Sequence, residues 1–178
     1  MMPLIPPTAS LLVIDLQTRL VPVLAGHKAL LHKAGLLVQA ARILSMPLIV
    51  TEQYPKGLGP TVPDLLPEGT GTFAKTSFDA TATRPIANRL ASAPDLIVIG
   101  AETHVCVLQT VLSLRALGKS VWVVGDATGS RTPENHAAGL ARMAAHGAGV
   151  VTTEMVLFEV LRDAGHPDFR AISALIKG

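Results

Sequence analysis

Residues 95–112 read DLIVIGAETHVCVLQTVL, and this stretch decides the fold. Its apolar first half, residues 96–100, is typical of a buried strand, whereas residues 105–117 carry the apolar spacing of a helix. Cys106 therefore lies where a strand ends and a helix begins. Unpaired N–H groups and the positive end of the helix dipole favour a thiolate at such a place. We therefore expect the pKa of the Cys106 thiol to lie below that of a free cysteine.

Cys106 is also the only cysteine of the chain. A lone cysteine cannot form an internal disulfide, so it serves either chemistry or packing. Free cysteines are common in hydrophobic cores, so residue type alone leaves both a nucleophile and a packing residue open.

The composition is that of one folded domain, which we predict to span residues 1–178. Hydrophobic residues make up 49% of the chain and charged residues 16%, which excludes disorder. A net charge of +2 without any basic cluster argues against a nucleic-acid partner. The apolar runs are of strand length, so we expect no membrane association. The apolar bias favours a homo-oligomer, and we expect a cytoplasmic location.

The apolar pattern of residues 96–100 recurs along the chain with helical segments between the runs. Continuous apolar runs indicate strands that are buried on both faces of a parallel sheet. The predicted strands are residues 11–15, 47–51, 72–75, 95–100, 120–125 and 149–152. The predicted helices are residues 28–46, 79–93, 105–117, 132–147, 154–163 and 168–177. This alternation predicts an α/β fold, a doubly wound open sheet of about six parallel strands with helices on both faces.

Residues 52–71 interrupt the alternation. They contain four prolines and four glycines and show no periodic pattern. A loop of this length within a compact domain usually has a function.

Three reactive side chains are predicted at strand ends. Asp15 ends the first strand, Lys75 ends the short third one, and Cys106 follows the central one. Ligands of open α/β sheets bind beyond these carboxyl ends. There an ammonium would lower the pKa of the thiol, and a carboxylate could accept its proton and return it to a leaving group. The ordinary alternatives are a turn-capping aspartate and a solvated lysine.

Three separated motifs carry a resemblance to a known family. They are LVIDLQ at 12–17, FAKTSF at 73–78 and GAETHVCV at 100–107. Together they resemble the isochorismatase-like cysteine hydrolase superfamily. Residues 51–61, TEQYPKGLGPT, are similar to the branch of isochorismatase domain-containing proteins. The resemblance implies a Rossmann-like, three-layer α/β/α fold and a small-molecule substrate.

The resemblance also implies a role for each strand-end residue. Asp15 matches the family's proton-transferring aspartate, Lys75 its lysine and Cys106 its nucleophile. A cis peptide bond would fall between Ala101 and Glu102. The backbone N–H groups of Glu102 and Cys106 would then form an oxyanion hole. The implied reaction is attack of the thiolate on a carbonyl-like carbon, followed by hydrolysis of the covalent intermediate.

Further side chains near the strand ends are candidates for lining the pocket, although each could equally pack in the core. The candidates are Gln17, Leu20, Tyr54, Phe73 and Phe78. Gln17 could instead orient Asp15. We expect His104 to be no part of a Cys/His pair, because residues two apart at a helix start point in different directions.

Metal chemistry is not expected. Nicotinamidases of this superfamily bind a divalent metal through an Asp-x-His motif after the second strand, where this chain reads Glu52-Gln53-Tyr54. No histidine occurs between His32 and His104, and imidazole is the ligand that zinc and iron prefer. We therefore expect neither a metal nor another cofactor.

These observations predict a metal-independent cysteine hydrolase of a small carbonyl-, amide- or enol-ether-type metabolite. Two alternatives stay open: an amidase or ureidohydrolase of the same superfamily, and a catalytically idle member that acts as an interaction module. A phosphoacceptor receiver domain is disfavoured because no acidic pair occurs at the first strand. A phosphatase with an Asp-x-Asp motif is disfavoured because position 17 is glutamine.

Overall fold

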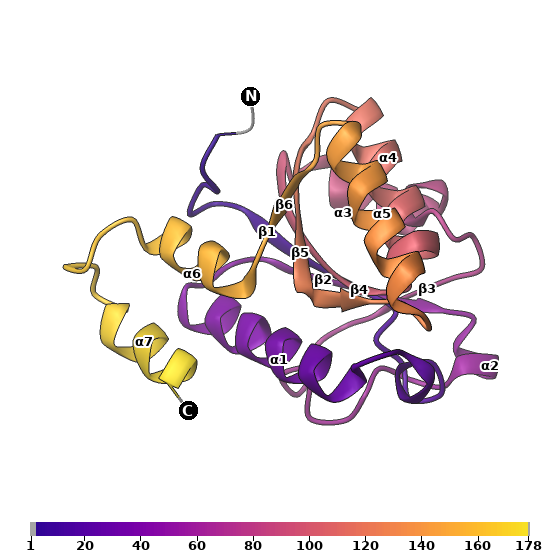
Figure 1. Ribbon diagram of the computed structural model, residues 1–178, viewed down its shortest axis with the longest axis horizontal. Coiled ribbons are helices and arrows are strands. Elements are labelled where there is room, and N and C mark those ends of the chain that lie inside the picture. The colour runs from indigo at the N-terminus through magenta and orange to yellow at the C-terminus, as the bar shows by residue number, and fades with distance from the viewer. Residues whose placement is uncertain (1–2, 178) are drawn as a thin grey trace.

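The computed structural model describes residues 3–177, which form one sheet between two layers of helices (Figure 1). All six strands are parallel, in the order β3-β2-β1-β4-β5-β6. The strands are β1 (Ser10–Ile14), β2 (Leu48–Gln53), β3 (Phe73–Lys75), β4 (Asp95–Ala101), β5 (Ser120–Gly129) and β6 (Gly149–Val151). The predicted doubly wound α/β fold is confirmed.

Helices cover both faces of the sheet. They are α1 (His27–Ile43), α2 (Pro55–Leu58), α3 (Arg84–Ala91), α4 (Leu108–Ala116), α5 (Pro133–Ala145), α6 (Thr153–Leu161) and α7 (Phe169–Lys177). In Figure 1, α1, α6 and α7 lie on one side of the sheet and α3, α4 and α5 on the other. Each side has its own apolar core, which explains why the central parts of the strands are continuous apolar runs. Within residues 3–177 no helix is long and apolar enough to cross a bilayer.

The central strands β1 and β4 approach closely at Gly100. This residue has a φ of 131°, and a Cβ atom there would collide with the carbonyl oxygen of Ile14. Only glycine fits such a backbone without strain. Ile14 pairs with Gly100 on one side and with Thr51 on the other. The pairing brings Asp15, the next residue, between the carboxyl ends of two neighbouring strands.

Residues 79–93 do not form the single helix that the sequence predicted. A 3₁₀ turn, Ala80–Ala82, comes first, and α3 begins only after Thr83, whose backbone is extended. Asp79 caps the turn by accepting the Thr81 N–H at 2.8 Å. Pro85 has no N–H to donate within a continuous helix, whereas the first turn of α3 tolerates it.

Residues 52–71 are more ordered than the expected long loop. Glu52 and Gln53 still belong to β2, where they pair with Ala74 and Lys75 of β3. The short helix α2 follows directly. The helix predicted at residues 105–117 also differs, because a π-helical turn at Thr103–Val107 precedes α4.

Candidate active site

The candidate site lies where the strand order reverses. The chain winds from β1 through β2 to β3 in one direction, and then returns past β1 to β4, β5 and β6. The crevice beyond the carboxyl ends at such a switch point is where doubly wound folds bind ligands. Asp15 follows β1, Lys75 ends β3, and Cys106 lies in the π-helical turn after β4.

Asp15 and Lys75 form a buried ion pair. The Nζ atom of Lys75 lies 2.7 Å from Oδ2 of Asp15, and neither side chain has any exposed surface. The other carboxylate oxygen accepts the hydroxyl of Thr51, also at 2.7 Å. Asp15 has a left-handed backbone, with φ at 53°, a conformation that aspartate tolerates better than most residues. Both carboxylate oxygens are therefore held in place.

The Lys75 ammonium has two further acceptors. It donates to Oε1 of Gln53 at 2.8 Å and to the carbonyl oxygen of Ser77 at 3.3 Å. The contact between Gln53 and Lys75 could not be predicted from the sequence, because a strand's sequence does not say which residue of its neighbour lies opposite. The register supplies that information, since Gln53 pairs with Lys75.

The Cys106 thiol is buried against this pair, with 5% of the residue exposed. The pKa of Cys106 is raised to about 12, mainly because the thiol is buried. The Asp15 carboxylate also raises this pKa, and the Lys75 ammonium lowers it by a smaller amount. The expectation of a lowered pKa is therefore wrong. The loss of solvent around the thiol and the negative charge beside it outweigh the effect of the helix terminus on this pKa. At neutral pH the thiol keeps its proton, next to a carboxylate that can accept it.

The turn that carries Cys106 is tied to its surroundings. The peptide bond between Ala101 and Glu102 is cis. The carbonyl oxygen of Glu102 accepts the N–H groups of both Val105 and Val107, which produces the π-helical turn. The Glu102 carboxylate accepts Nε of Arg131 at 2.9 Å. These hydrogen bonds hold the backbone of the turn that contains Cys106.

The two residues after Glu102 are hydrogen-bonded to the segment that follows β5. Nδ1 of His104 lies 3.0 Å from the Ser130 hydroxyl, and the Thr103 hydroxyl lies 2.9 Å from Nδ1 of His136. Burial lowers the pKa of His136, which favours its neutral form. His104 is thus bonded to the segment after β5.

Of the candidate lining residues, Tyr54 lies in a depression of about 440 Å³ that Lys75 also lines. Lys56 also lines this depression, whereas the side chain of Lys75 has no exposed surface. Phe78 is half-exposed. Leu20 and Phe73 pack against the two apolar cores.

Gln17 is fully buried and fastens the segment after β2. Its Nε2 donates to the carbonyl oxygens of Gln53 and Gly59, and its Oε1 accepts the Gln53 N–H at 2.7 Å. Gln17 thus holds the backbone of Gln53 rather than the carboxylate of Asp15.

The acid that stands in place of the nicotinamidase metal motif has partners within the protein. The Glu52 carboxylate accepts the N–H and hydroxyl of Thr61, both at 2.8 Å. Among residues 3–177, no group of three or more His, Cys, Asp or Glu side chains could hold a metal ion.

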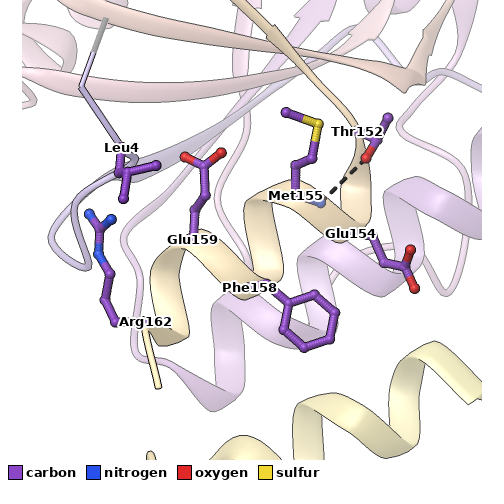
Figure 2. Close-up of a pocket in the computed structure, with 7 residues that line it drawn as sticks. All are labelled: Leu4, Thr152, Glu154, Met155, Phe158, Glu159 and Arg162. Carbon is purple, nitrogen blue, oxygen red and sulfur yellow. Dashed lines mark hydrogen bonds between the residues drawn. The ribbon is translucent and has the colours of Figure 1, made fainter. Parts of the chain in front are cut away.

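A second hollow, which we call the α6 hollow, lies elsewhere on the molecule (Figure 2). It measures about 470 Å³ and is lined by Leu4, Thr152, Glu154, Met155, Phe158, Glu159 and Arg162. None of these residues belongs to the cluster of Asp15, Lys75 and Cys106. Glu159 accepts the Ile5 N–H at 3.0 Å, and Arg162 donates to the Ile5 carbonyl oxygen at 2.8 Å, so both fasten the segment before β1.

Fold and site define an α/β protein whose acid, amine and thiol meet at the switch point of a parallel sheet. The model of the isochorismatase domain family matches residues 9–155, and the chain belongs to this family. Isochorismatase domain-containing protein 2A of Mus musculus is 36% identical over 175 residues, which cover 98% of this chain and 85% of the relative.

Solved structures show the same fold. A structure described as the MAR1 ribonuclease from Caenorhabditis elegans has a TM-score of 0.92 and 39% identity, and the match covers 98% of this chain and 92% of that one. YcaC from Pseudomonas aeruginosa, in a structure with hexane-2,5-diol and covalent acrylamide, has a TM-score of 0.84 and 27% identity. That match covers 96% of this chain and 94% of the other.

Proposed function

We propose that the protein is a cysteine hydrolase that cleaves a small carbonyl-, amide- or enol-ether-type metabolite without a metal. The observation that carries this proposal is the 2.7 Å ion pair of Asp15 and Lys75, both fully buried, beside the one thiol of the chain. A buried ion pair is costly, and a well-packed apolar pair is often as stable. Its presence at a strand-end switch point therefore favours chemistry over packing.

An amide-type substrate would be cleaved in two stages, formation of a thioester with Cys106 and its hydrolysis. The Cys106 thiol gives its proton to Asp15 as sulfur forms a bond to the carbonyl carbon. The bond to the leaving group breaks, and Asp15 returns the proton to that group. Water then attacks the thioester, a proton passes to Asp15, and the acid leaves as the thiol is restored. The Lys75 ammonium stabilises the negative charge that appears near the carboxylate and the sulfur.

Backbone N–H groups of Glu102 and Cys106 would receive the oxyanion in this scheme. Acrylamide is an electrophile that thiolates attack, and the covalent acrylamide in the P. aeruginosa YcaC structure supports a reactive nucleophile in a related protein. A small amide or ureido compound remains the alternative within the enzyme class. A catalytically idle interaction module is the alternative outside it.

The test is a panel of small amides, ureides and vinyl ethers offered to the wild type and to Cys106→Ala. We expect turnover by the wild type that falls at least about 10⁴-fold in the variant. Mass spectrometry of the intact protein during turnover should show a covalent adduct only on the wild type. Prior treatment with a chelator should leave the rate unchanged. Equal rates for both proteins would overturn the proposed nucleophile.

RNA belongs in the same panel, because the C. elegans relative is described as a ribonuclease. The chain itself has 15 basic and 13 acidic residues without a basic cluster, which favours a small substrate. RNA cleavage that survives purification and is lost in Cys106→Ala would replace the small-molecule proposal. A homo-oligomer in the cytoplasm completes the proposal, and light scattering of the purified protein tests the assembly.

A further inference from the structure

Gln53 reaches the Lys75 ammonium from the neighbouring strand. Its Oε1 lies 2.8 Å from Nζ, nearly as close as the Asp15 carboxylate at 2.7 Å. The third acceptor, the carbonyl oxygen of Ser77, is more distant at 3.3 Å. An ammonium has three protons to donate, and the two short bonds decide where it points.

The orientation of the Gln53 amide is set by its neighbours. Its Nε2 donates to the carbonyl oxygen of Thr76 at 2.7 Å. A carbonyl group only accepts and an ammonium only donates, so the reversed amide would lose both bonds. Gln17 holds the main chain of the same residue through the Gln53 N–H and carbonyl oxygen. Each polar group of Gln53 is therefore engaged, and Oε1 is directed at Lys75.

An uncharged hydrogen-bond acceptor beside Lys75 affects the Cys106 thiol differently from a charged one. The groups facing the Cys106 thiol are the Asp15 carboxylate, which disfavours the thiolate, and the Lys75 ammonium, which favours it. A second carboxylate would add negative charge beside the sulfur, whereas an amide directs the ammonium without adding any. The neighbouring acid on β2, Glu52, is bonded to Thr61 and does not take this position.

We propose that Gln53 is a positioning residue that holds the Lys75 ammonium against Asp15 and Cys106 and thereby sets the reactivity of the thiol. The inference rests on the proposed role of Cys106 as nucleophile and assigns Gln53 a part in the same site. Gln53 acts only through Lys75, so its removal should matter only while Lys75 is present.

The experiment needs no substrate, because Cys106 is the one thiol and its alkylation by iodoacetamide can be followed by mass spectrometry. Rates are measured from pH 8 to pH 11 for the wild type, Gln53→Leu and Gln53→Glu, with Gln39→Leu on the exposed face of α1 as the matched control. We expect Gln53→Leu to slow alkylation about tenfold, which corresponds to one pKa unit of the thiol. The control should match the wild type.

Gln53→Glu separates positioning from a merely structural role. The carboxylate loses the bond to the Thr76 carbonyl oxygen but still binds the ammonium, whereas leucine loses both bonds, so the Tm should stay nearer the wild type than that of Gln53→Leu. Its negative charge should nevertheless make alkylation slower than in Gln53→Leu. A structural residue would move Tm and reactivity in the same order.

A double-mutant cycle with Lys75→Met completes the test, because effects that pass through one partner vanish when that partner is gone. Gln53→Leu should then change the alkylation rate less than twofold. Should Lys75→Met fail to fold, the order of the two Gln53 variants decides alone. Wild-type alkylation profiles in both Gln53 variants would overturn the inference, whereas absence of any hydrolysis by the wild type would overturn the proposed function instead.

Discussion

The strand-end cluster of Asp15, Lys75 and Cys106 is buried, whereas the polar groups of the α6 hollow lie at the surface. The hollow is open to solvent, and Figure 2 shows exposed apolar side chains, including Met155 and Phe158, beside polar ones. Its Glu159 and Arg162 serve to fasten the backbone of Ile5. The cluster has almost no exposed surface, yet its acid and amine bond each other at 2.7 Å beside the thiol.

Under the proposed function, the volume of a hollow is a poor guide to where the chemistry of this fold takes place. An open hollow of about 470 Å³ needs only surface side chains to line it. Burying a carboxylate and an ammonium costs several kcal/mol per ion before their attraction offsets it, so such a pair calls for a functional reason. If this interpretation is right, substitutions in the cluster should be far more damaging to activity than substitutions in the hollow.

The largest effect is expected from Asp15→Asn. An amide cannot take the thiol proton, so hydrolysis should fall roughly 10²–10⁴-fold. Breaking the buried pair with Lys75 should also lower the free energy of unfolding by about 3–5 kcal/mol. Alkylation of Cys106 should become faster, because the carboxylate that raises the thiol pKa is gone. Rates, iodoacetamide labelling and urea unfolding measure the three effects.

Asp64→Asn, in the exposed segment after α2, is the matched control and should behave as the wild type. An Asp15→Asn protein that hydrolyses substrate at near the wild-type rate would leave Asp15 as a structural acid. The cluster would then differ from the hollow only in burial.

The next effect concerns the raised pKa of Cys106. At pH 8 the folded protein should react with iodoacetamide roughly 10²–10³-fold more slowly than the urea-unfolded chain, because fewer thiolates are present. The alkylation midpoint should lie near the pKa of about 12. A midpoint at or below that of a free cysteine would restore the helix-terminus interpretation.

The same shift predicts a pH dependence of stability. The folded-state pKa of Cys106 is raised from 9.0 to about 12, so the unfolded chain loses its proton first as the pH rises. The neutral thiol contributes fully to the free energy of unfolding below about pH 9, and this contribution is lost as the pH rises from the unfolded-state pKa to the folded-state pKa. The stability of the wild type relative to Cys106→Ala should therefore decline over that interval.

A smaller effect is expected from Thr51→Val, which keeps the shape of the side chain and removes the hydroxyl that Asp15 accepts at 2.7 Å. The loss should cost about 1–3 kcal/mol of stability, because a buried carboxylate oxygen loses its partner. Hydrolysis should fall about tenfold as the carboxylate becomes less well placed. Thr51→Ser keeps the hydroxyl and should recover most of the rate. Equal losses in both variants would point to packing instead.

The sequence predicted the parts of this site that depend on one segment at a time. Continuous apolar runs identified the strands, and the carboxyl ends of three of them pointed to Asp15, Lys75 and Cys106 as candidates. Properties that depend on two segments far apart in the chain were either not predicted or predicted wrongly. Gln53 contacts Lys75 only through the register of β2 and β3, and the pKa of Cys106 depends on burial and on a carboxylate 91 positions away in the chain.

The sequence also predicted the ends of two elements, a helix and a strand, at the wrong residues. The sequence predicts one helix over residues 79–93, whereas Pro85, which has no N–H, lies in the first turn of the shorter helix α3. The predicted strand ends at residue 51, whereas β2 continues through the polar residues Glu52 and Gln53. In the structure both side chains find partners at the carboxyl end of the sheet, Thr61 for Glu52 and Lys75 for Gln53.

The smallest effect is expected in the α6 hollow. Phe158 is 49% exposed, and Phe158→Ser should change the free energy of unfolding by about 0.5 kcal/mol or less. Hydrolysis should stay within twofold of the wild type, since the hollow shares no residue with the cluster. Light scattering shows whether the exposed apolar side chains serve assembly, because loss of an oligomer with activity retained would assign the hollow to an interface. A tenfold loss of hydrolysis without any change in assembly would instead place part of the active site at α6, and the contrast between the two regions would no longer hold.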